Sequence, residues 1–471
     1  MNNFREYNQA QGIFRTIIPD KLLEAAHPAR IIDKVVEMLD LQKLYAYYKE
    51  EGNPSYHPKM MLKVLFYGYY AGLMSCRKLW KGLETRADFI YLSGDQVPNF
   101  RTINAFRTRH IKELPELFAQ IVFLCRKLGM IDFKYLAIDG QKIRANADFR
   151  KSKDRERVEA SYRRVKEGIK KLVEKEVSED FTEQKKQKRI EGLKKQEKKL
   201  LELKEVLEGL DEEGVTINMT DAEAAVMKHK DKRMLPSYNH QSAVDGKYGV
   251  TIAVKTTAKP DCPEDLLGLV DQAKENSRGG HENVLADSGF CNYEVLEKVE
   301  EKREGEFYIP DKRYEVTEKG GTTKGEYDIS KFKRGEDGEM YCPRGQGMKL
   351  INTQRYQDGH SVLIYEGVGC EGCPEHEACT GGKKRKIAVD SREGYRERMR
   401  EKLRSDKGRE AYMRRQGIVE PVNGDDQKNR GWRQHHLRGK AKASLEFMLI
   451  RITSNLGKII KYRAAELLAM G

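Results

Sequence analysis

Apolar residues recur at helical spacing through the first quarter of the chain, separated by polar and charged positions. The residues that show this spacing are Leu22, Leu23, Ile31, Ile32, Val35, Val36, Met38 and Leu39. Further helices are predicted to begin at Pro58, because proline suits a first helical turn, and near Thr102, with Thr102 as the N-cap. We therefore predict that residues 1–130 form an all-helical domain.

The pattern changes near Lys134, where short apolar runs replace the helical spacing. In KYLAIDG an apolar run ends in Asp139, which Gly140 follows, and in ENVLADSGF a second run ends in Asp287, before Ser288-Gly289; each run is predicted to be a buried strand. Two β-branched runs flank a tight turn at Asp245-Gly246, and Glu306–Pro310 is a further short strand. Strands mixed with helices, some of them in hairpin order, predict an α/β domain with a mixed sheet.

A long, highly charged segment interrupts this domain after its first strand. Two apolar seams with heptad-like spacing run through it: Val158, Tyr162, Val165, Ile169 and Leu172, then Leu193, Leu200, Leu203, Leu207 and Leu210. A break at Val177–Thr182 would let the two halves fold back on each other. We predict a helical hairpin over residues 150–213 and interpret it as a solvated arm without a catalytic role.

Helical spacing returns near Glu393 and continues to the end of the chain. The last part is an apolar stripe at Leu445, Met448, Leu449, Ile452, Leu456, Ile459 and Ile460. We predict that residues 391–471 complete the α/β domain, after an inserted segment over residues 311–390.

The charge balance indicates what kind of partner to expect. Among 471 residues, 88 Lys and Arg stand against 74 Asp and Glu, a formal net charge of +14. Such a surplus favours a polyanion such as nucleic acid, although a protein from a lysine-rich proteome would show it too. Near Thr102 the basic residues suit either a helix-turn-helix docked on DNA or a solvated bundle face: Arg101, Arg107, Arg109 and His110.

No apolar run approaches the roughly 20 residues that a membrane-spanning helix needs. The first residues, MNNFREYNQAQGIF, lack the uninterrupted apolar stretch of a signal peptide. We therefore expect a cytoplasmic protein with no membrane partner, in which the scattered cysteines are reduced.

Asp139 and Asp287 give the first indication of chemistry. A carboxylate at the end of a buried strand lies at the sheet edge where α/β folds bind ligands. Two such carboxylates on neighbouring strands, with a third from a helix, form an oxygen cage suited to two Mg²⁺ or Mn²⁺ ions. An ion pair of this kind supports in-line displacement at phosphorus without a protein nucleophile. The alternative is that each aspartate only caps a turn.

The segment Tyr412–Ala443, YMRRQGIVEPVNGDDQKNRGWRQHHLRGKAKA, makes the interpretation specific. It resembles the C-terminal signature of DDE-type insertion-sequence transposases, with its EPV…G…NRG frame. YLAIDGQKIRANA and VLADSGF resemble the two catalytic strands of that family, and Thr220–Asp231 with Tyr238–Asp245 resembles the region between them. The resemblance implies an RNase H-like catalytic domain, a mixed sheet with helices on both faces, over residues 131–310 and 391–471.

The resemblance also implies roles for single residues. Glu420 would join Asp139 and Asp287 as the third catalytic, metal-binding carboxylate. The residues expected to bind DNA phosphates are Tyr412, Arg415, Lys428, Arg430 and Arg438. Trp432 would either stack on an unpaired base near the cleavage point or pack in the core at a helix start.

The signature departs from the family pattern in its second half. Asn423 stands where phenylalanine is usual, and Gln427 where a lysine is expected, with Lys428 one position later. A shift of one residue rotates a helical side chain by about 100°, and the adjacent Asp425 and Asp426 would repel phosphate. These departures motivate an alternative function: a catalytically degenerate relative that binds DNA without cutting it.

The implied function is that of a DNA transposase, which cuts the ends of its element and joins 3′-hydroxyls to target DNA by two-metal phosphoryl transfer. Its partners would be double-stranded DNA, both terminal inverted repeats and target, and a second copy of the chain in a homodimer on DNA. Such an enzyme would be nucleoid-associated within the cytoplasm. A metal-dependent nuclease without strand transfer would use the same site.

Four of the eight cysteines lie in the inserted segment over residues 311–390: Cys342, Cys370, Cys373 and Cys379. Four thiolates can bind zinc tetrahedrally, with His360 and His376 as competing ligands. The alternative is a reduced cluster without metal. The transposase family carries cysteines in this segment, which favours a structural zinc site and not a catalytic one.

Overall fold

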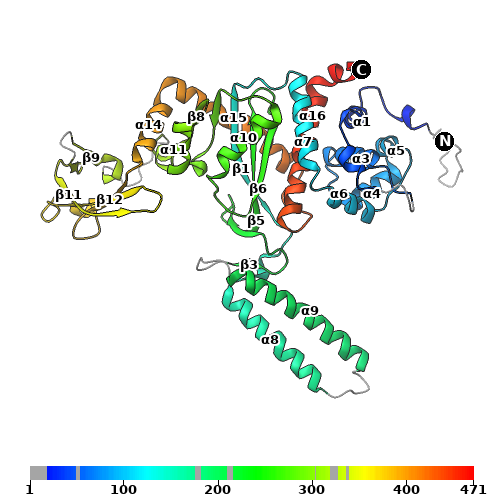
Figure 1. Cartoon of the computed structure of the whole chain (residues 1–471), viewed down its shortest axis with the longest axis horizontal. Coiled ribbons are helices and arrows are strands. Elements are labelled where there is room, and N and C mark those ends of the chain that lie inside the picture. The colour runs from blue at the N-terminus through cyan, green and yellow to red at the C-terminus, as the bar shows by residue number, and fades with distance from the viewer. Residues whose placement is uncertain are drawn as a thin grey trace, which may run out of the picture. The chain divides into compact units, whose positions relative to one another are not determined.

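A computed structural model describes residues 18–48, 54–175, 182–208, 216–302, 304–318, 327–335 and 339–470 (Figure 1). The chain forms two compact units. Unit 1 comprises Met1–Leu128 with Leu445–Gly471, and unit 2 comprises Gly129–Ser444. Within the described residues, no helix combines the length and the apolar character needed to cross a membrane.

The described part of unit 1 is helical, as predicted for the N-terminal region. Its helices are η1 (Pro19–Leu22), α1 (Pro28–Met38), α2 (Gln42–Tyr45), α3 (Pro58–Tyr70), α4 (Cys76–Thr85), α5 (Ala87–Ser93), α6 (Phe100–Arg109), α7 (Leu114–Lys127) and most of α16 (Lys440–Ala469). Helix α3 begins at Pro58, as expected. The N-cap of α6 is Asn99 and not Thr102, because the Asn99 carboxamide accepts the amides of Arg101 and Thr102 at 2.9 and 3.0 Å.

Part of the predicted basic face belongs to the core of unit 1. Arg107 is 4% exposed, and its Nη1 donates to the hydroxyl of Tyr69 at 2.7 Å. His110 is also buried, and its ring contacts the ring of Phe106 edge-on. Arg107 and His110 therefore stabilise the helical packing, and only Arg101 and Arg109 remain on the surface.

The C-terminal stripe groups with the N-terminal helices, whereas we expected residues 391–471 to belong wholly to the α/β domain. From Leu445 onward the chain is part of unit 1. The stripe is buried except for Ile460, and polar residues on other sides of α16, such as Glu446 and Asn455, are buried too. Arg463 Nε donates to the backbone carbonyl of Leu128 at 3.1 Å. A helix buried on several sides needs surrounding helices, which unit 1 supplies.

Unit 2 is built on a mixed sheet, which confirms the mixed α/β class. Its strand order is β4-β5-β1-β7-β8, and β6 also pairs with β5. Strand β1 is antiparallel to β5 and parallel to β7, and β7 is parallel to β8. The bounds are β1 Tyr135–Arg144, β4 Ala225–Lys228, β5 Met234–Asp245, β6 Thr251–Thr257, β7 Asn283–Leu285 and β8 Glu306–Tyr308.

Both faces of this sheet are buried around β1. Ala137 joins a core cluster with Val419 and Val422 of α15 (Asp406–Gly424). Leu136 and Ile138 point to the opposite face, because side chains alternate along a strand, and both are at most 1% exposed. The connecting helices are α10 (Asp265–Ser277), α11 (Tyr293–Lys302), α12 (Lys312–Glu318) and α14 (Glu393–Arg404).

The junction between α14 and α15 requires a glycine. A Cβ on Gly408 would overlap the backbone carbonyl of Lys402, whereas a Cβ on Gly417 of the same helix would meet nothing within 4 Å. We expect Gly408→Ala to lower the free energy of unfolding of unit 2 by about 1–3 kcal/mol, through forced backbone movement. Gly417→Ala, the matched control, should raise it by about 0.5–1 kcal/mol, because alanine favours helix.

Urea denaturation followed by Trp432 fluorescence would check this pair of variants. The chain has two tryptophans, Trp80 in unit 1 and Trp432 in unit 2, so a Trp80→Phe background makes the signal report on unit 2. Equal effects of the two alanines would show that the Lys402 contact does not constrain the junction.

The charged insertion consists of two helices that pack side by side, α8 (Arg155–Glu174) and α9 (Glu183–Glu208) (Figure 1). Their shared core contains residues of both predicted seams: Val158, Val165, Leu200, Leu203 and Leu207. Strands β2 (Ser152–Lys153) and β3 (Ile217–Asn218) pair at the base of this arm. Leu210 and most of the expected break at Val177–Thr182 lie outside the described residues.

A second, antiparallel sheet lies in the cysteine-containing segment, where we had predicted only an insertion. Its strand order is β13-β12-β11-β10-β9. The bounds are β9 Lys333–Arg334, β10 Met340–Tyr341, β11 Gly347–Arg355, β12 Ser361–Gly367 and β13 Lys386–Asp390. Most of β11 is exposed, so its sequence lacks the alternation of apolar and polar residues that marks a half-buried strand.

Candidate active site

Two aspartates lie level with each other beyond a pair of parallel strands. The last paired residues of β1 and β7 are Ala137 and Leu285, and Asp139 and Asp287 each follow two positions later. Asp139 therefore shares the face of Ala137, which packs under α15. Strand β1 continues past Asp139 to Arg144, paired there with β5, so it is longer than the predicted apolar run.

One guanidinium joins the two aspartates. Arg415 Nη2 lies 2.7 Å from Asp139 Oδ1 and 3.3 Å from Asp287 Oδ2. Arg415 stands one turn before Val419 on α15 and belongs to the row of the helix that faces the sheet. The helical spacing that buries Val419 therefore also places Arg415 between the carboxylates. The structure brings Asp139 and Asp287 together, as the strand pattern predicted.

Polar side chains after Arg415 complete the contact with β1. Asn423 Nδ2 donates to Asp139 Oδ2 at 2.7 Å. Two positions along β1, Gln141 Nε2 donates to the fully buried carboxylate of Asp426 at 2.8 Å. Gln427 Nε2 donates to Gln141 Oε1 at 3.4 Å. Asn423 and Gln427, the two residues that depart from the pattern expected from the sequence, thus contact β1.

The local electrostatics favour a cation between the aspartates. Burial raises the pKa of Asp287 to about 6; the Arg415 guanidinium opposes this rise, and the charge of Asp139 adds to it. Glu315 contributes further negative charge, and its carboxylate accepts a hydrogen bond from Ser288 Oγ at 2.8 Å. Burial also raises the pKa of the Tyr412 hydroxyl, against the opposing charge of Arg415. Tyr412 therefore stays neutral beside the pair.

Glu420 is not joined to the aspartate pair in this structure. Its carboxylate accepts a hydrogen bond from Gln416 Nε2 at 2.8 Å, on the exposed side of α15. Glu420 and Lys428 both line an open hollow of about 600 Å³. Among the described residues, no group of three or more His, Cys, Asp or Glu side chains is placed to hold a metal ion. Two of the three expected carboxylates are thus together, and the third faces the hollow.

The expected phosphate-binding residues differ in their surroundings. Lys428 is exposed beside the hollow, and Arg438 is exposed with its Nε donating to the carbonyl of Asn146 at 3.0 Å. The Arg430 side chain is only 10% exposed, and its Nε binds Asp425 Oδ2 at 2.8 Å. The charge of Arg430 is therefore already matched inside the protein, whereas Lys428 and Arg438 are accessible.

Trp432 packs in the core of unit 2. It is 1% exposed, and its ring lies 5.4 Å from the ring of His240 and 5.2 Å from that of His435. The Nε2 atoms of these two histidines are 2.8 Å apart. Of the two roles left open by the sequence, core packing is the one that this structure shows.

Sequence reasoning missed the contributions of Gln141 and Asp426 to the site. A signal for Asp426 existed, because it follows Arg415, Val419 and Val422 at the i, i+4, i+7, i+11 spacing of one helix face. No comparable signal marks Gln141 except its position two residues after Asp139, on the same face of the strand.

Two family models match separate parts of the chain. A model described as a transposase DDE domain matches residues 341–460, and one described as a transposase domain (DUF772) matches residues 18–109. The first match includes Arg415 and Glu420, and the second covers the described helices of unit 1 from η1 to α6. No curated protein and no solved structure gave a match.

Proposed function

Because this chain belongs to the DDE transposases of insertion sequences, we propose that it cuts the ends of its element and joins the 3′-hydroxyls to target DNA. We also propose that the mixed sheet of unit 2 is RNase H-like, with β1 and β7 as the catalytic strands. The observation that carries the proposal is the pairing of Asp139 and Asp287 through Arg415.

Asp139 and Asp287 would hold two Mg²⁺ or Mn²⁺ ions together with Glu420. Their oxygens are the ligands that such hard cations prefer. The fit is supported by Arg415, because a positively charged nitrogen already lies between one oxygen of each aspartate. When bound, the ions would activate the attacking oxygen and stabilise the leaving one.

Arg415 has two tasks in this proposal. In the metal-free protein its guanidinium offsets the repulsion between the aspartates. Its Nε is buried and has no hydrogen-bond partner among the described residues, so one donor remains unused. If cations took its place at the carboxylates, the guanidinium could bind a DNA phosphate, a group that suits its fork of donors.

A π-helical turn offsets the unusual position of Lys428. Residues Asp425–Asn429 form this turn directly after α15. A π turn closes i→i+5 bonds and fits more residues into each turn, so side chains along it lag behind the positions they would have on a regular α-helix. This supports activity, because Lys428 lines the same hollow as Glu420 despite the shift in sequence.

The alternative function is DNA binding without cleavage. One observation favours it: both carboxylate oxygens of Asp139 already accept hydrogen bonds, one from the Asn423 amide at 2.7 Å and the other from Arg415. If a cation cannot displace either hydrogen bond, Asp139 and Asp287 cannot serve as a metal site. Cleavage activity therefore distinguishes the two functions.

Transposition also implies partners. We propose that the enzyme acts as a homodimer on DNA, holding two terminal inverted repeats, within the nucleoid. In unit 1 the exposed Arg101 and Arg109 of α6 are candidates for phosphate contacts.

A cleavage assay tests the proposal. Purified protein with Mg²⁺ or Mn²⁺ should nick a supercoiled plasmid that carries the element's own inverted repeats, and should yield insertions flanked by short direct repeats. Binding of the repeats without nicking would favour the alternative function. Nicking that never gives insertions would indicate a nuclease.

Glu420 is expected to be essential although it faces the hollow. Glu420→Gln should reduce nicking by about a hundredfold, ~2.7 kcal/mol in barrier, because an amide lacks the charge that the ions require. Glu410→Gln on the same helix is the matched control, since that exposed carboxylate pairs only with Arg414 in the described contacts. Nicking rates on the same plasmid measure both. Unchanged nicking by Glu420→Gln would exclude it as the third ligand.

A further inference from the structure

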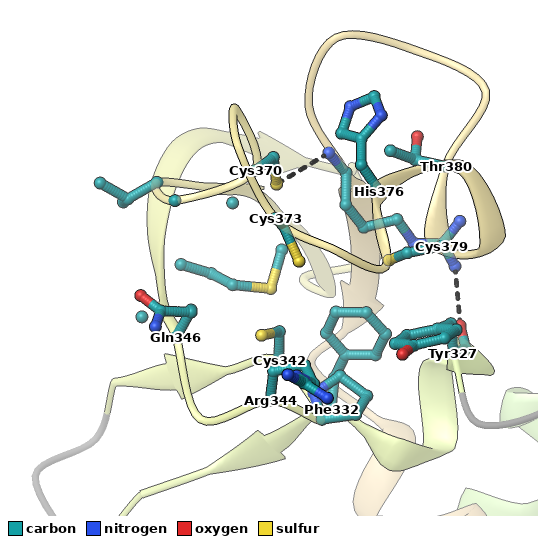
Figure 2. Close-up of a pocket in the computed structure, with 17 residues that line it drawn as sticks. Tyr327, Phe332, Cys342, Arg344, Gln346, Cys370, Cys373, His376, Cys379 and Thr380 are labelled. Atoms are coloured by element: carbon teal, nitrogen blue, oxygen red, sulfur yellow. Dashed lines mark hydrogen bonds between the residues drawn. The ribbon is translucent and has the colours of Figure 1, made fainter.

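Four cysteines line one small cavity in the segment that contains the second sheet. The cavity has a volume of about 40 Å³, and Figure 2 shows the labelled cysteines around it: Cys342, Cys370, Cys373 and Cys379. Together they make up half of the eight cysteines in the chain, and all four are free thiols in this structure. None of them belongs to the candidate active site.

Two tight turns present three of these thiols. Cys370 and Cys373 are the ends of a turn in which Gly372 has φ of 87°, a conformation that favours glycine. In the other loop, the amide of Gly345 (φ 76°) donates to the carbonyl of Cys342 at 2.8 Å. Each turn holds its cysteine backbone in a fixed place before any ligand binds.

The surroundings of Cys370 hold its sulfur in place. Its sulfur accepts a hydrogen bond from the backbone amide of Arg385 at 3.4 Å. Gly367 leaves room for this sulfur, because a Cβ there would come within 2.5 Å of it. Hydrogen bonds to a ligand atom from the surrounding shell orient the ligand and are a general feature of metal sites.

Two of the four cysteines, Cys342 and Cys379, pack against the hydrophobic core of this segment. The surrounding core is small, with five buried residues: Phe332, Met340, Met348, Tyr365 and Ile387. A core of this size gains from a metal crosslink.

We propose that Cys342, Cys370, Cys373 and Cys379 bind one structural Zn²⁺ ion. Four thiolates in a closed site match the tetrahedral preference of zinc and leave no position for a substrate. In the structure the sulfurs surround the cavity without converging on one point. To bind the ion, the cysteine side chains would have to turn inward about Cα–Cβ, and each thiol would release its proton.

Of the two histidines of the segment only His376 lines the cavity, and both make other contacts. His376 Nε2 lies 3.1 Å from the carbonyl oxygen of Lys383. His360 stacks on Tyr356 and binds Asp358 through Nδ1, and it does not line the cavity. We therefore assign all four ligand positions to cysteine.

Metal analysis of the full-length protein tests the assignment. The protein, purified without chelator, should contain about one zinc per chain by elemental mass spectrometry. Exchange for Co²⁺ should produce the visible absorption of tetrahedral thiolate-bound cobalt, which carboxylate-bound cobalt at Asp139 and Asp287 would not give. Wild-type protein that takes up neither metal at the thiols would overturn the proposal.

Single-residue variants locate the ion. Cys373→Ser should lose most of the zinc and the cobalt spectrum, whereas Cys76→Ser, a partly buried cysteine of unit 1, should keep both. His376→Ala should also keep both, and loss of metal there would overturn the all-cysteine assignment. If Cys373→Ser fails to fold, mercurial titration of the wild type should release the zinc as four thiols react. Release without thiol modification would contradict the site.

Discussion

Asp139→Asn is expected to reduce DNA nicking and joining by about a thousandfold or more, equivalent to ~4 kcal/mol in the barrier. Asparagine keeps the shape of the side chain and removes its charge. Two effects then combine, because the amide binds divalent cations poorly and the Arg415 guanidinium loses one of its two anionic partners. Binding to the terminal repeats should persist, since phosphate contacts do not require the carboxylate.

Nicking of a supercoiled plasmid and an electrophoretic mobility shift on repeat DNA would measure the two effects separately. Joining of a pre-cut end to target DNA should be lost in parallel, because both steps would use the same ions in the proposed reaction. Glu410→Gln again serves as the control on charge. Nicking by Asp139→Asn within a few-fold of the wild-type rate would remove Asp139 from the reaction, whatever its effect on binding.

Arg400→Ala is expected to destabilise unit 2 by about 3–5 kcal/mol. Arg400 and Asp311 form a largely buried ion pair, each side chain 10% exposed, and the guanidinium also binds Glu393 at 3.0 Å. Burial acts to raise the pKa of Asp311, but the Arg400 guanidinium holds that pKa below its ordinary value. Removing Arg400 leaves a buried carboxylate without its cation. That carboxylate also accepts the amide of Tyr314 in the first turn of α12, at 2.7 Å.

Arg398 offers a control two residues away on the same helix. It pairs with Glu300 at 2.6 Å, with side-chain exposures of 54% and 43%, so Arg398→Ala should cost under about 1 kcal/mol. Urea denaturation in the Trp80→Phe background, monitored through Trp432, compares the two variants. Similar costs for both would show that the Arg400 pair is no more important to stability than a surface pair.

Local patterns in the sequence were sufficient to predict the two strands that bring Asp139 and Asp287 together. Asp139 and Asp287 each follow an apolar run and precede glycine or Ser-Gly, and this signal needs no knowledge of distant residues. Their bridge by Arg415 could not be foreseen in the same way. The sheet-facing row of α15 mixes apolar and charged residues, so its apolar spacing alone does not show that Arg415 belongs to it.

Features that depend on contacts between residues far apart in the sequence could not be predicted from it. Trp432 is buried against His240 of strand β5 and against His435. These two histidines are 195 positions apart in the chain. The direction of the Glu420 side chain depends on its rotamer and on its hydrogen-bond partner on an exposed helix face. The sequence indicates neither. Glu420 became a candidate metal ligand through the resemblance to the transposase family. The spacing of apolar and polar residues around it does not single it out.

The base of the charged arm has a consequence for the order of folding. Strands β1 and β5 are neighbours in the sheet, yet the whole arm lies between Arg144 and Met234. Helical hairpins form early and locally, and the pairing of Ser152 with Asn218 brings the two ends of the arm together. The unstructured loop that must close when β1 pairs with β5 is then roughly four times shorter. This lowers the entropic cost of loop closure by about 1 kcal/mol. An insertion that closes on itself can therefore lengthen during evolution while the assembly rate of the host sheet stays almost constant.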